Sequence, residues 1–555
     1  MTESPATARR SRDWLAPALA ALVFALLSLA MLPYPGLQDD EISFSALIYH
    51  PEQAWFSVAA FGTRIPVMIM SYSGTLKTWL YAGLFEIFEP SRWSVRAPMV
   101  LVGIGTLSLT WLWTRRVAGT RAAVFTVALL ATDSIFILTN TLDWGPVAFQ
   151  HLFLMGGLLA VQIWLADESK RGMLALGFFL WGFGLWDKAL LIWPLIGMTV
   201  AVVCVYPRQL LARLRVVPLA IAVAAFLAGA LPLIVYNIAQ PGQTASDNTK
   251  LSINSIPGKV NELRRTIDGS VLFDSMVATI PGPVERVPKT VVERVSVWLK
   301  KTLGARHENW MLPALALAFA CLILLLRTPL WRPPVFLLIT MAVTWLQMAM
   351  NTGTGGAAHH VILLWPFPCV FVGMTLAGVT DRAPRSLNLA TNAVVALIAL
   401  GSLLNCNEYL ADLAMNGALG GWTDASYRLA GAVSHYQTNW IGTVDWGYRN
   451  NLRMWYGNDL KLFTATDQTR KPSMTDDDRR AFLGEIASPN SVYIQHTEEN
   501  QLYDNVNGQL RSAALALGYK EQVERIVHDN EGRPVFEIFR FVNTGTNSAP
   551  AQVRQ

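Results

Sequence analysis

The chain has 555 residues, of which 52% are hydrophobic and only 15% are charged. Ordinary soluble domains carry about 25% charged residues, so the composition argues against a soluble enzyme. The formal net charge of +5 lies in short connectors, not in a basic stripe that could follow the phosphates of a nucleic acid. Apolar runs of about 20 residues, the length that crosses a hydrocarbon core of roughly 30 Å, predict a polytopic membrane protein.

The first apolar run begins at Trp14 and follows Arg9, Arg10 and Arg12. It is too long for a signal peptide and is not followed by a small-residue cleavage site, so we expect a retained first span. Hydropathy predicts about eleven spans in all. Their approximate bounds are 14–33, 95–113, 122–140, 146–166, 173–186, 189–206, 217–237, 309–326, 334–350, 360–380 and 388–405.

Basic residues occupy the loops between alternate spans, on the same side as the N-terminus. Short loops rich in Lys and Arg stay cytoplasmic, so the pattern predicts a cytoplasmic N-terminus in a multi-pass protein of the cell inner (cytoplasmic) membrane. An odd number of spans puts the C-terminus in the periplasm or outside the cell. The loops contain Arg115, Arg116 and Arg121; Lys170 and Arg171; Arg208, Arg213 and Arg215; Arg327 and Arg332; and Arg382 and Arg385.

The chain divides into a membrane domain, 1–410, and an extracytoplasmic α/β domain, 411–545. The membrane domain includes predicted interfacial helices in 34–94 and an outer loop, 238–308. In the second domain, 491–494 and 535–539 resemble strands, and 510–517 resembles a helix that ends at Gly518. The tail, 546–555, is predicted to be disordered.

Three consecutive carboxylates, Asp39, Asp40 and Glu41, follow the first span. Near a low-dielectric surface their repulsion raises at least one pKa unless a cation lies close by. A simpler interpretation is a helix N-terminus, where acids are favoured by the cap and by the helix dipole.

Further ionisable residues are predicted at the same side of the membrane. Asp143 stands between the third and fourth spans, where it could instead cap a helix before Pro146. Lys188 stands between the fifth and sixth spans, where it could instead be a snorkelling interfacial lysine. The segment 61–81 adds Arg64 and Lys77 among apolar residues, which is typical of amphipathic helices lying in the interface.

The Gly-rich turn 351–358 ends in His359 and His360. Glycines let backbone N–H groups approach an anion, and a histidine can donate to phosphate or bind a divalent ion, so one of the two could contact phosphate or sugar. A plain interfacial turn is the alternative. The segment 445–450 combines aromatic and polar residues as sugar-binding surfaces do, but it is equally compatible with a strand end and turn in the core of the second domain.

An acid at the outer membrane face, with cations beside it, suits a substrate whose reactive bond lies at the lipid headgroup level. A polyprenyl-phosphate sugar is such a molecule, because its tail dissolves between helices and its phosphate needs positive partners. A carboxylate could accept the proton of an acceptor hydroxyl while basic residues stabilise the departing phosphate. One such displacement inverts the anomeric carbon, and no second acid is needed as a nucleophile.

At these residues the chain resembles a known family. Asp40-Glu41 after the first span resembles the Asp-Glu motif in the first outer loop of the GT-C glycosyltransferases, in the branch of the protein O-mannosyltransferases and the lipid A aminoarabinose transferases. The phrase from Ser94 to Pro98 is similar to the Arg-Leu-Pro at which that family's second span begins. The resemblance covers roughly 30–370.

The resemblance implies a GT-C-like membrane fold, with Asp40 as the catalytic base, Asp143 as the acid of the second outer loop and Lys188 as the lysine after the fifth span. The chain departs from the family pattern in two places. The extra Asp39 leaves Asp39 or Asp40 as the base, and the usual Lys-Pro-Pro of the first loop is replaced by Arg64-Ile65-Pro66 and a separate Lys77. Some relatives use a divalent metal and others do not, so a metal at Asp40, Glu41 or His360 stays open.

The leading hypothesis is an inverting glycosyltransferase, a hexosyl- or pentosyltransferase, that moves a sugar from a polyprenyl phosphate to a lipid, glycan or protein acceptor outside the cytoplasm. The predicted catalytic residues are Asp40, Asp39, Glu41 and Asp143. The predicted phosphate or donor ligands are Lys188, Arg64, Lys77, His359 and His360.

Two other classes compete with this hypothesis. A transporter or flippase for lipid-linked sugars would place its charges near the bilayer midplane, whereas here they collect at the outer ends of the spans. In a non-catalytic scaffold, the carboxylates would serve only as helix caps. Substitution of Asp40 by Asn separates these classes, because only the transferase loses glycosyl transfer while it still folds.

Overall fold

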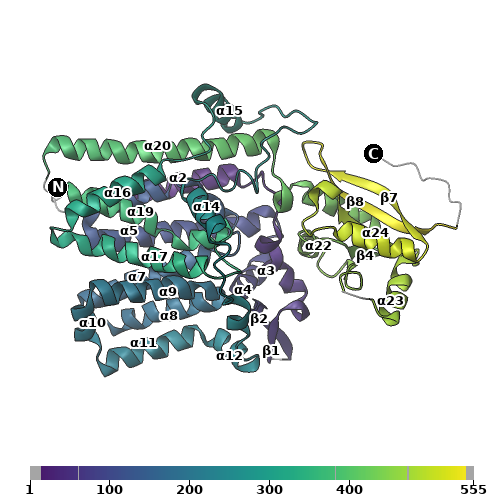
Figure 1. The fold of residues 1–555 in the computed structure, drawn as a ribbon, viewed down its shortest axis with the longest axis horizontal. Coiled ribbons are helices and arrows are strands. Elements are labelled where there is room, and N and C mark those ends of the chain that lie inside the picture. Colours follow the sequence, from purple (N-terminus) through teal and green to yellow (C-terminus); the bar gives the residue numbers. More distant parts are fainter. Residues whose placement is uncertain (1–13, 61, 382, 472–473, 546–555) are drawn as a thin grey trace.

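The computed structural model describes residues 14–60, 62–381, 383–471 and 474–545. Arg9, Arg10, Arg12, Arg382 and the tail 546–555 lie outside the described residues. A bundle of long helices forms one end of the molecule and an α/β module forms the other (Figure 1). Between them lies a layer of short helices and strands, so the chain has three parts along its long axis.

The first half of the bundle is a series of apolar helices. It contains α2 (Leu15–Met31), α5 (Arg92–Leu130), α6 (Ser134–Thr141), α7 (Ala148–Ala166), α8 (Arg171–Asp187), α9 (Ile192–Val205), α10 (Pro207–Arg213), α11 (Val216–Gly229) and α12 (Leu231–Ala239). Helix α7 packs between α5 and α8, and α11 covers the other side of α8. Glycines allow the close approaches: a Cβ at Gly182 of α8 would collide with the backbone of α11.

The second half of the bundle surrounds a central helix, α19, which is buried along almost its whole length. Helices α5, α16 and α17 pack against α19. The helices of this half are α13 (Gln243–Asn248), α14 (Ile256–Ile267), α15 (Val291–Leu303), α16 (Met311–Leu325), α17 (Arg332–Ala349), α18 (Ala358–Val361), α19 (Phe367–Val379) and α20 (Arg385–Asn416).

Among the described residues, five helices are long and apolar enough to cross a membrane, or up to seven if each bent pair of helices is one span. The chain is therefore a multi-pass membrane protein. The predicted apolar runs coincide with helices. The runs 95–113 and 122–140 lie on either side of a break at Gly119 (φ 87°) within α5, and the second run continues into α6. The number of eleven spans stays a prediction.

The layer between the two ends contains a helix, a three-stranded antiparallel sheet and a second helix. Its elements are α3 (Asp39–Tyr49), β1 (Phe56–Ala60), β2 (Thr63–Met70), β3 (Ser73–Gly74) and α4 (Leu76–Phe85). The prediction of helices throughout 61–81 is wrong for its first part. A tight turn pairs Ala60 with Thr63, and the apolar, partly β-branched residues after it favour a strand.

The α/β module is built on a five-stranded mixed sheet in the order β5-β4-β6-β8-β7. Strands β4 (Trp440–Thr443), β5 (Lys461–Thr464) and β6 (Ser491–His496) are parallel, whereas β8 (Pro534–Asn543) pairs antiparallel with β6 and with β7 (Tyr519–His528). Its helices are α21 (Ala425–Val433), α22 (Arg449–Tyr456), α23 (Asp476–Ile486) and α24 (Val506–Ala516).

The predicted α/β module is thus confirmed, and the three segments expected to be strands or helix lie in β6, β8 and α24. The domain boundary at 410 stays a prediction, because α20 continues without a break to Asn416. Short 3-10 helices complete the chain: Pro51–Gln53, Ala189–Leu191, Pro329–Trp331, Ile362–Leu364, Gly420–Trp422, Ser434–Tyr436 and Glu498–Asn500.

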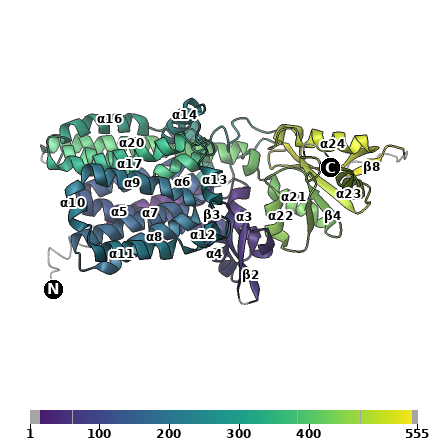
Figure 2. The same ribbon diagram turned by 60° about the horizontal axis from the view of Figure 1, so that its bottom comes forward.

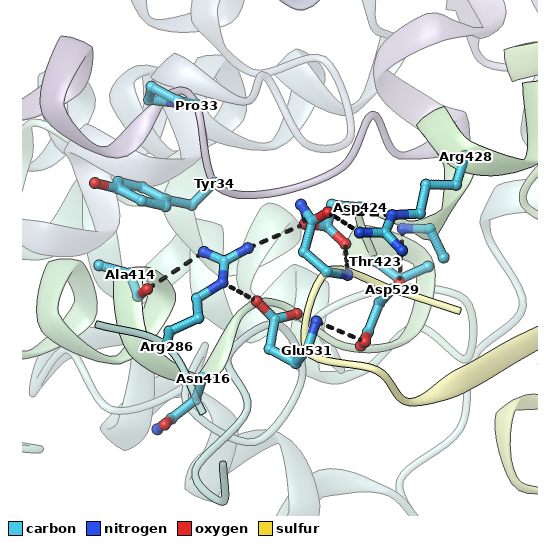
Figure 3. A network of polar contacts seen from close by, with 12 residues as sticks. Pro33, Tyr34, Arg286, Ala414, Asn416, Thr423, Asp424, Arg428, Asp529 and Glu531 are labelled. Carbon is cyan, nitrogen blue, oxygen red and sulfur yellow. Dashed lines mark hydrogen bonds and ion pairs between the residues drawn. The ribbon is translucent and has the colours of Figure 1, made fainter. Parts of the chain in front are cut away.

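A polar network fixes the module to the bundle (Figure 3). Its centre is Arg286, from the connection between α14 and α15. The guanidinium contacts Glu531 at 2.6 Å and Asp424 at 3.6 Å, and it donates to the carbonyl oxygen of Ala414 at 3.3 Å. Glu531 is fully buried, so its charge depends on Arg286 and on Arg533, which contacts it at 3.2 Å.

Candidate active site

Helix α3 carries the three consecutive acids in its first turn. Its N-cap is Gln38, whose side-chain oxygen accepts a hydrogen bond from the Asp40 backbone N–H at 2.7 Å, and Glu41 completes the capping box. The three acids therefore do lie at a helix N-terminus, as the simpler interpretation of the sequence proposed. Successive residues of a helix point about 100° apart, so the three carboxylates face three different environments.

Glu41 is buried and bound to Arg96 of α5. The Arg96 Nε and Nη2 atoms contact the two Glu41 carboxylate oxygens at 2.5 and 2.8 Å. The remaining guanidinium hydrogens reach carbonyl oxygens of the segment that leads into α3, namely those of Leu32, Pro35 and Gly36. Both oxygens of Glu41 are thus engaged by Arg96, and the pair fixes α3 to α5.

Asp143 is buried and bound to Lys77 of α4. Its Oδ1 accepts hydrogen bonds from the backbone N–H groups of Val147 and Ala148 at 2.9 and 2.8 Å, so the carboxylate caps the start of α7. Its Oδ2 lies 2.6 Å from the Lys77 Nζ. The structure therefore shows the helix-cap geometry, together with an ion pair that joins α4 to the connection between α6 and α7.

Lys188 follows α8 and is almost fully buried, at 2% exposure, so it does not snorkel to the surface. Its ammonium donates to the Gly145 carbonyl oxygen, and its backbone forms a bridge with Ser73. The neighbouring Asp187 accepts a hydrogen bond from Gln150 at 3.0 Å. Lys188 is thereby held at the end of the bundle that faces the module.

Asp40 points toward Lys188 and Lys77. It is partly exposed, whereas Asp39, Glu41 and Asp143 are buried. Burial raises the pKa of Asp40, while the Gln38 amide, the positive charges of Lys188 and Lys77, and a hydrogen bond from Trp144 lower it. Of the four predicted carboxylates, Asp40 thus combines access with nearby cations, which is the geometry a general base needs.

Asp39 points away from this group and toward the α/β module. Its Oδ2 accepts a hydrogen bond from the Asn450 side chain of α22 at 3.0 Å. Burial, with the adjacent Asp40 charge, raises the pKa of Asp39 to about 7. The geometry therefore favours Asp40 over Asp39 as the residue that faces a substrate.

His359 and His360 lie beside the same group. The His359 ring packs against Trp144 with centroids 4.7 Å apart and the ring planes tilted by 55°, and the centroids of the two histidine rings are 4.1 Å apart. Gly145 has φ 64°, and a Cβ there would meet the His359 ring, so a glycine is required. The turn before the histidines is anchored by Lys259 of α14, whose ammonium donates to carbonyl oxygens at the end of α17.

Arg64 is not part of this group. It lies exposed on β2, opposite Ala59 of β1. The structure therefore brings together Asp40, Lys188, Lys77, Asp143, His359 and His360, turns Asp39 and Glu41 to other partners, and leaves Arg64 aside.

Sequence reasoning gave no role to several residues that complete the site. Arg96 appeared only inside a motif, although an arginine within an apolar span is a signal of a buried partner. Trp144 and Gln150 gave no such signal, since aromatic and amide residues are common at the ends of membrane helices.

The residues suggested for a divalent metal are Asp40, Glu41 and His360. Within the described part of the chain, no group of three or more His, Cys, Asp and Glu side chains has the arrangement of a metal site. Arg96 occupies both oxygens of Glu41, and Asp40 faces Lys188.

A large apolar cavity of about 960 Å³ lies between α5, α7, α8, α9 and α11. Its lining reaches Arg116 and Arg213 at the end of the bundle away from the module, and Ile192 toward the other end. It is separate from the site at Asp40.

Comparison with known proteins supports the expected class. A model of the dolichyl-phosphate-mannose-protein mannosyltransferase family matches residues 74–236, a stretch that includes Lys77, Arg96, Asp143 and Lys188. A search of curated protein sequences found no match.

Solved structures with the same fold cover nearly the whole chain. ArnT from Cupriavidus metallidurans, bound to undecaprenyl phosphate, is 15% identical with a TM-score of 0.58, and the match covers 94% of this chain and 97% of ArnT. The Archaeoglobus fulgidus oligosaccharyltransferase is 14% identical with a TM-score of 0.50, and the match covers 96% of this chain and 75% of that protein. The chain therefore has a GT-C-like fold, which confirms the predicted architecture.

Proposed function

We propose that this protein is an inverting glycosyltransferase that moves a sugar from a polyprenyl phosphate to an acceptor hydroxyl. The observation that carries the proposal is the position of Asp40: a partly exposed carboxylate that faces Lys188, where an apolar helix bundle meets a polar module. The mannosyltransferase family match and the fold shared with ArnT support the same class of reaction.

In the proposed reaction, Asp40 accepts the proton of the acceptor hydroxyl as its oxygen attacks the anomeric carbon. The new bond joins that oxygen to the sugar, and the bond between the anomeric carbon and the phosphate oxygen breaks. The polyprenyl phosphate leaves with the electron pair, and Lys188 stabilises its negative charge. A single displacement inverts the anomeric centre.

The ion pairs around Asp40 keep this geometry in place. Arg96 fixes Glu41 and the start of α3, while the Lys77–Asp143 pair joins α4 to the connection before α7. His359 and Trp144 form an aromatic wall near Asp40, which suits contact with a sugar ring. We propose that Asp39 and Glu41 support Asp40 in place of reacting themselves.

We also propose that the module and the site lie on the extracytoplasmic side of the cytoplasmic membrane, with a hexose or pentose as the transferred sugar. The positive loops predicted from the sequence support this orientation. The ionisable site residues gather at one end of the bundle and not at its middle, which favours a transferase over a transporter or flippase.

The first experiment compares Asp40→Asn with Asp39→Asn in the purified full-length protein. Mass spectrometry of the lipid that copurifies with the protein names the donor, and transfer of its sugar is then measured. We expect Asp40→Asn to lower the rate by roughly 10²–10⁴-fold, the usual contribution of a general base, and Asp39→Asn to lower it far less. Full activity in a folded Asp40→Asn protein would contradict the proposal.

A further inference from the structure

Helix α22 of the module lies directly against α3 (Figure 2). Two amides of α22 fix the contact: Asn450 donates to Asp39 at 3.0 Å, and Asn451 donates to the Leu37 carbonyl oxygen at 3.1 Å. Arg449 and Arg453 lie one turn apart on the same helix, and residues at that spacing are neighbours on a helix surface. Both positive charges act on Asp39.

Both guanidinium groups make few hydrogen bonds for groups that are so enclosed. Arg453 is only 5% exposed; its Nη1 donates to Asn450 at 3.4 Å, and its Nε has no partner. Arg449 donates to the Thr464 hydroxyl at 2.5 Å, and its buried Nε also has no partner. Within the described residues, neither guanidinium lies within 4.0 Å of a carboxylate.

Such an arrangement is costly without a ligand. A buried charge that lacks a close counterion carries a desolvation penalty that its surroundings do not offset. Burial, with repulsion by Arg449, lowers the pKa of Arg453 to about 10. The carboxylates that face the two arginines are Asp39, Glu52 and Asp467, and none forms an ion pair with them.

We propose that Arg449 and Arg453 form a subsite for a phosphate group of the acceptor. Two guanidinium groups supply the charge and the planar donors that match a phosphate monoester. The Arg453–Asn450–Asp39 contacts lead from this subsite to the residue beside Asp40. The assignment of the phosphate to an acceptor rests on the proposed function, and it makes the acceptor a phosphorylated lipid or a phosphorylated glycan.

Inorganic phosphate is the first probe, titrated into the purified full-length protein in nanodiscs of phosphatidylcholine and followed by calorimetry. We expect saturable binding that weakens by about tenfold or more in Arg453→Gln and in Arg449→Gln, as hydrogen bonds to charged groups are lost. Arg453→Lys, which keeps the charge, should retain part of the affinity. Arg479→Gln, at an exposed arginine of α23, is the matched control and should bind as the unmodified protein does.

A second set of measurements separates the two sources of the phosphate. Nanodiscs that contain phosphatidic acid should compete with inorganic phosphate if the group belongs to a lipid, whereas mannose 6-phosphate should compete if it belongs to a soluble glycan. Absence of saturable binding, or equal binding in the folded Arg449→Gln/Arg453→Gln double variant, would overturn the subsite.

The phosphate-binding measurement does not depend on whether Asp40 is the catalytic base. Asp40→Asn should bind phosphate as the unmodified protein does, because Asp40 faces away from α22. If Asp40→Asn retained transfer while the arginine variants lost phosphate binding, the proposed base would be wrong and the subsite would stand.

Discussion

Asp39 and Asp40 are adjacent in the chain but lie in different surroundings. Asp40 faces the two lysines at the end of the bundle, and Asp39 faces Asn450 of the module. The sequence could not decide between them, because the rotation of α3 depends on the Arg96–Glu41 pair, whose members are 55 positions apart. The Arg96–Glu41 pair thus helps to set which way each acid faces.

The raised pKa of Asp39 predicts a pH-dependent stability. The folded protein keeps a proton on Asp39 up to about pH 7, whereas the unfolded chain releases it near pH 4. The folded state therefore binds more protons in this window, and its stability falls as pH rises through it. Thermal unfolding should show Asp39→Asn gaining stability relative to the unmodified protein between about pH 4 and about pH 8. A difference in unfolding temperature between the two proteins that does not change with pH would contradict a raised pKa of Asp39.

Lys188 predicts a second effect at the level of one residue. Lys188→Met removes the cation that faces Asp40, so transfer should fall by roughly 10²-fold or more, as when one stabilising donor of a transition state is lost. Lys170→Met, at an exposed lysine before α8, is the control and should keep its rate. Equal rates in both variants would exclude Lys188 from stabilising the leaving phosphate.

The sequence was informative about residue types and less so about partners. Lys77 and Asp143 both stood out as charges among apolar residues, yet their pairing joins α4 to the connection between α6 and α7, which no local pattern relates. The same holds for Asp39 and Asn450, which are 411 positions apart. Long-range contacts of this kind depend on the complete fold.

At the scale of elements, the Arg96–Glu41 pair joins α3 to α5. Breaking a buried ion pair by removing one member costs about 3–5 kcal/mol, because the other charge is left uncompensated. Arg96→Met should therefore lower the unfolding temperature and reduce transfer, although Arg96 does not face Asp40. Arg96→Met/Glu41→Gln should recover part of the stability, measured by thermal unfolding in the same detergent. No recovery would show that the carbonyl contacts of Arg96 dominate.

Element prediction succeeded where apolar periodicity was long and failed where it was short. The membrane helices and the module strands β6 and β8 were recognisable from their patterns. The hairpin of β1 and β2 was predicted as helix, since a short apolar segment at an interface fits both structures. The pairing of β1 with β2 across the turn at Gly62 makes this segment a hairpin and not a helix.

At the scale of the whole molecule, the network around Arg286 connects bundle and module. Arg286→Met leaves the buried Glu531 without its closest cation, so the module should loosen and the protein should lose about 3–5 kcal/mol of stability. Hydrogen exchange should rise at β7, β8 and α22 in this variant. Arg286→Met/Glu531→Gln should restore protection, whereas unchanged exchange in the single variant would show that other contacts hold the module.

The contact between α22 and α3 also has a consequence for synthesis. Asp39 leaves the ribosome 411 residues before Asn450 does, a delay of about 20–80 s at ordinary translation rates. During that time the nascent chain already contains Asp40 but lacks Asn450 and Asn451, which fix α3 from the module side. Until the module has been made, α3 and the segment that leads into it therefore lack the two hydrogen bonds that Asn450 and Asn451 donate to them.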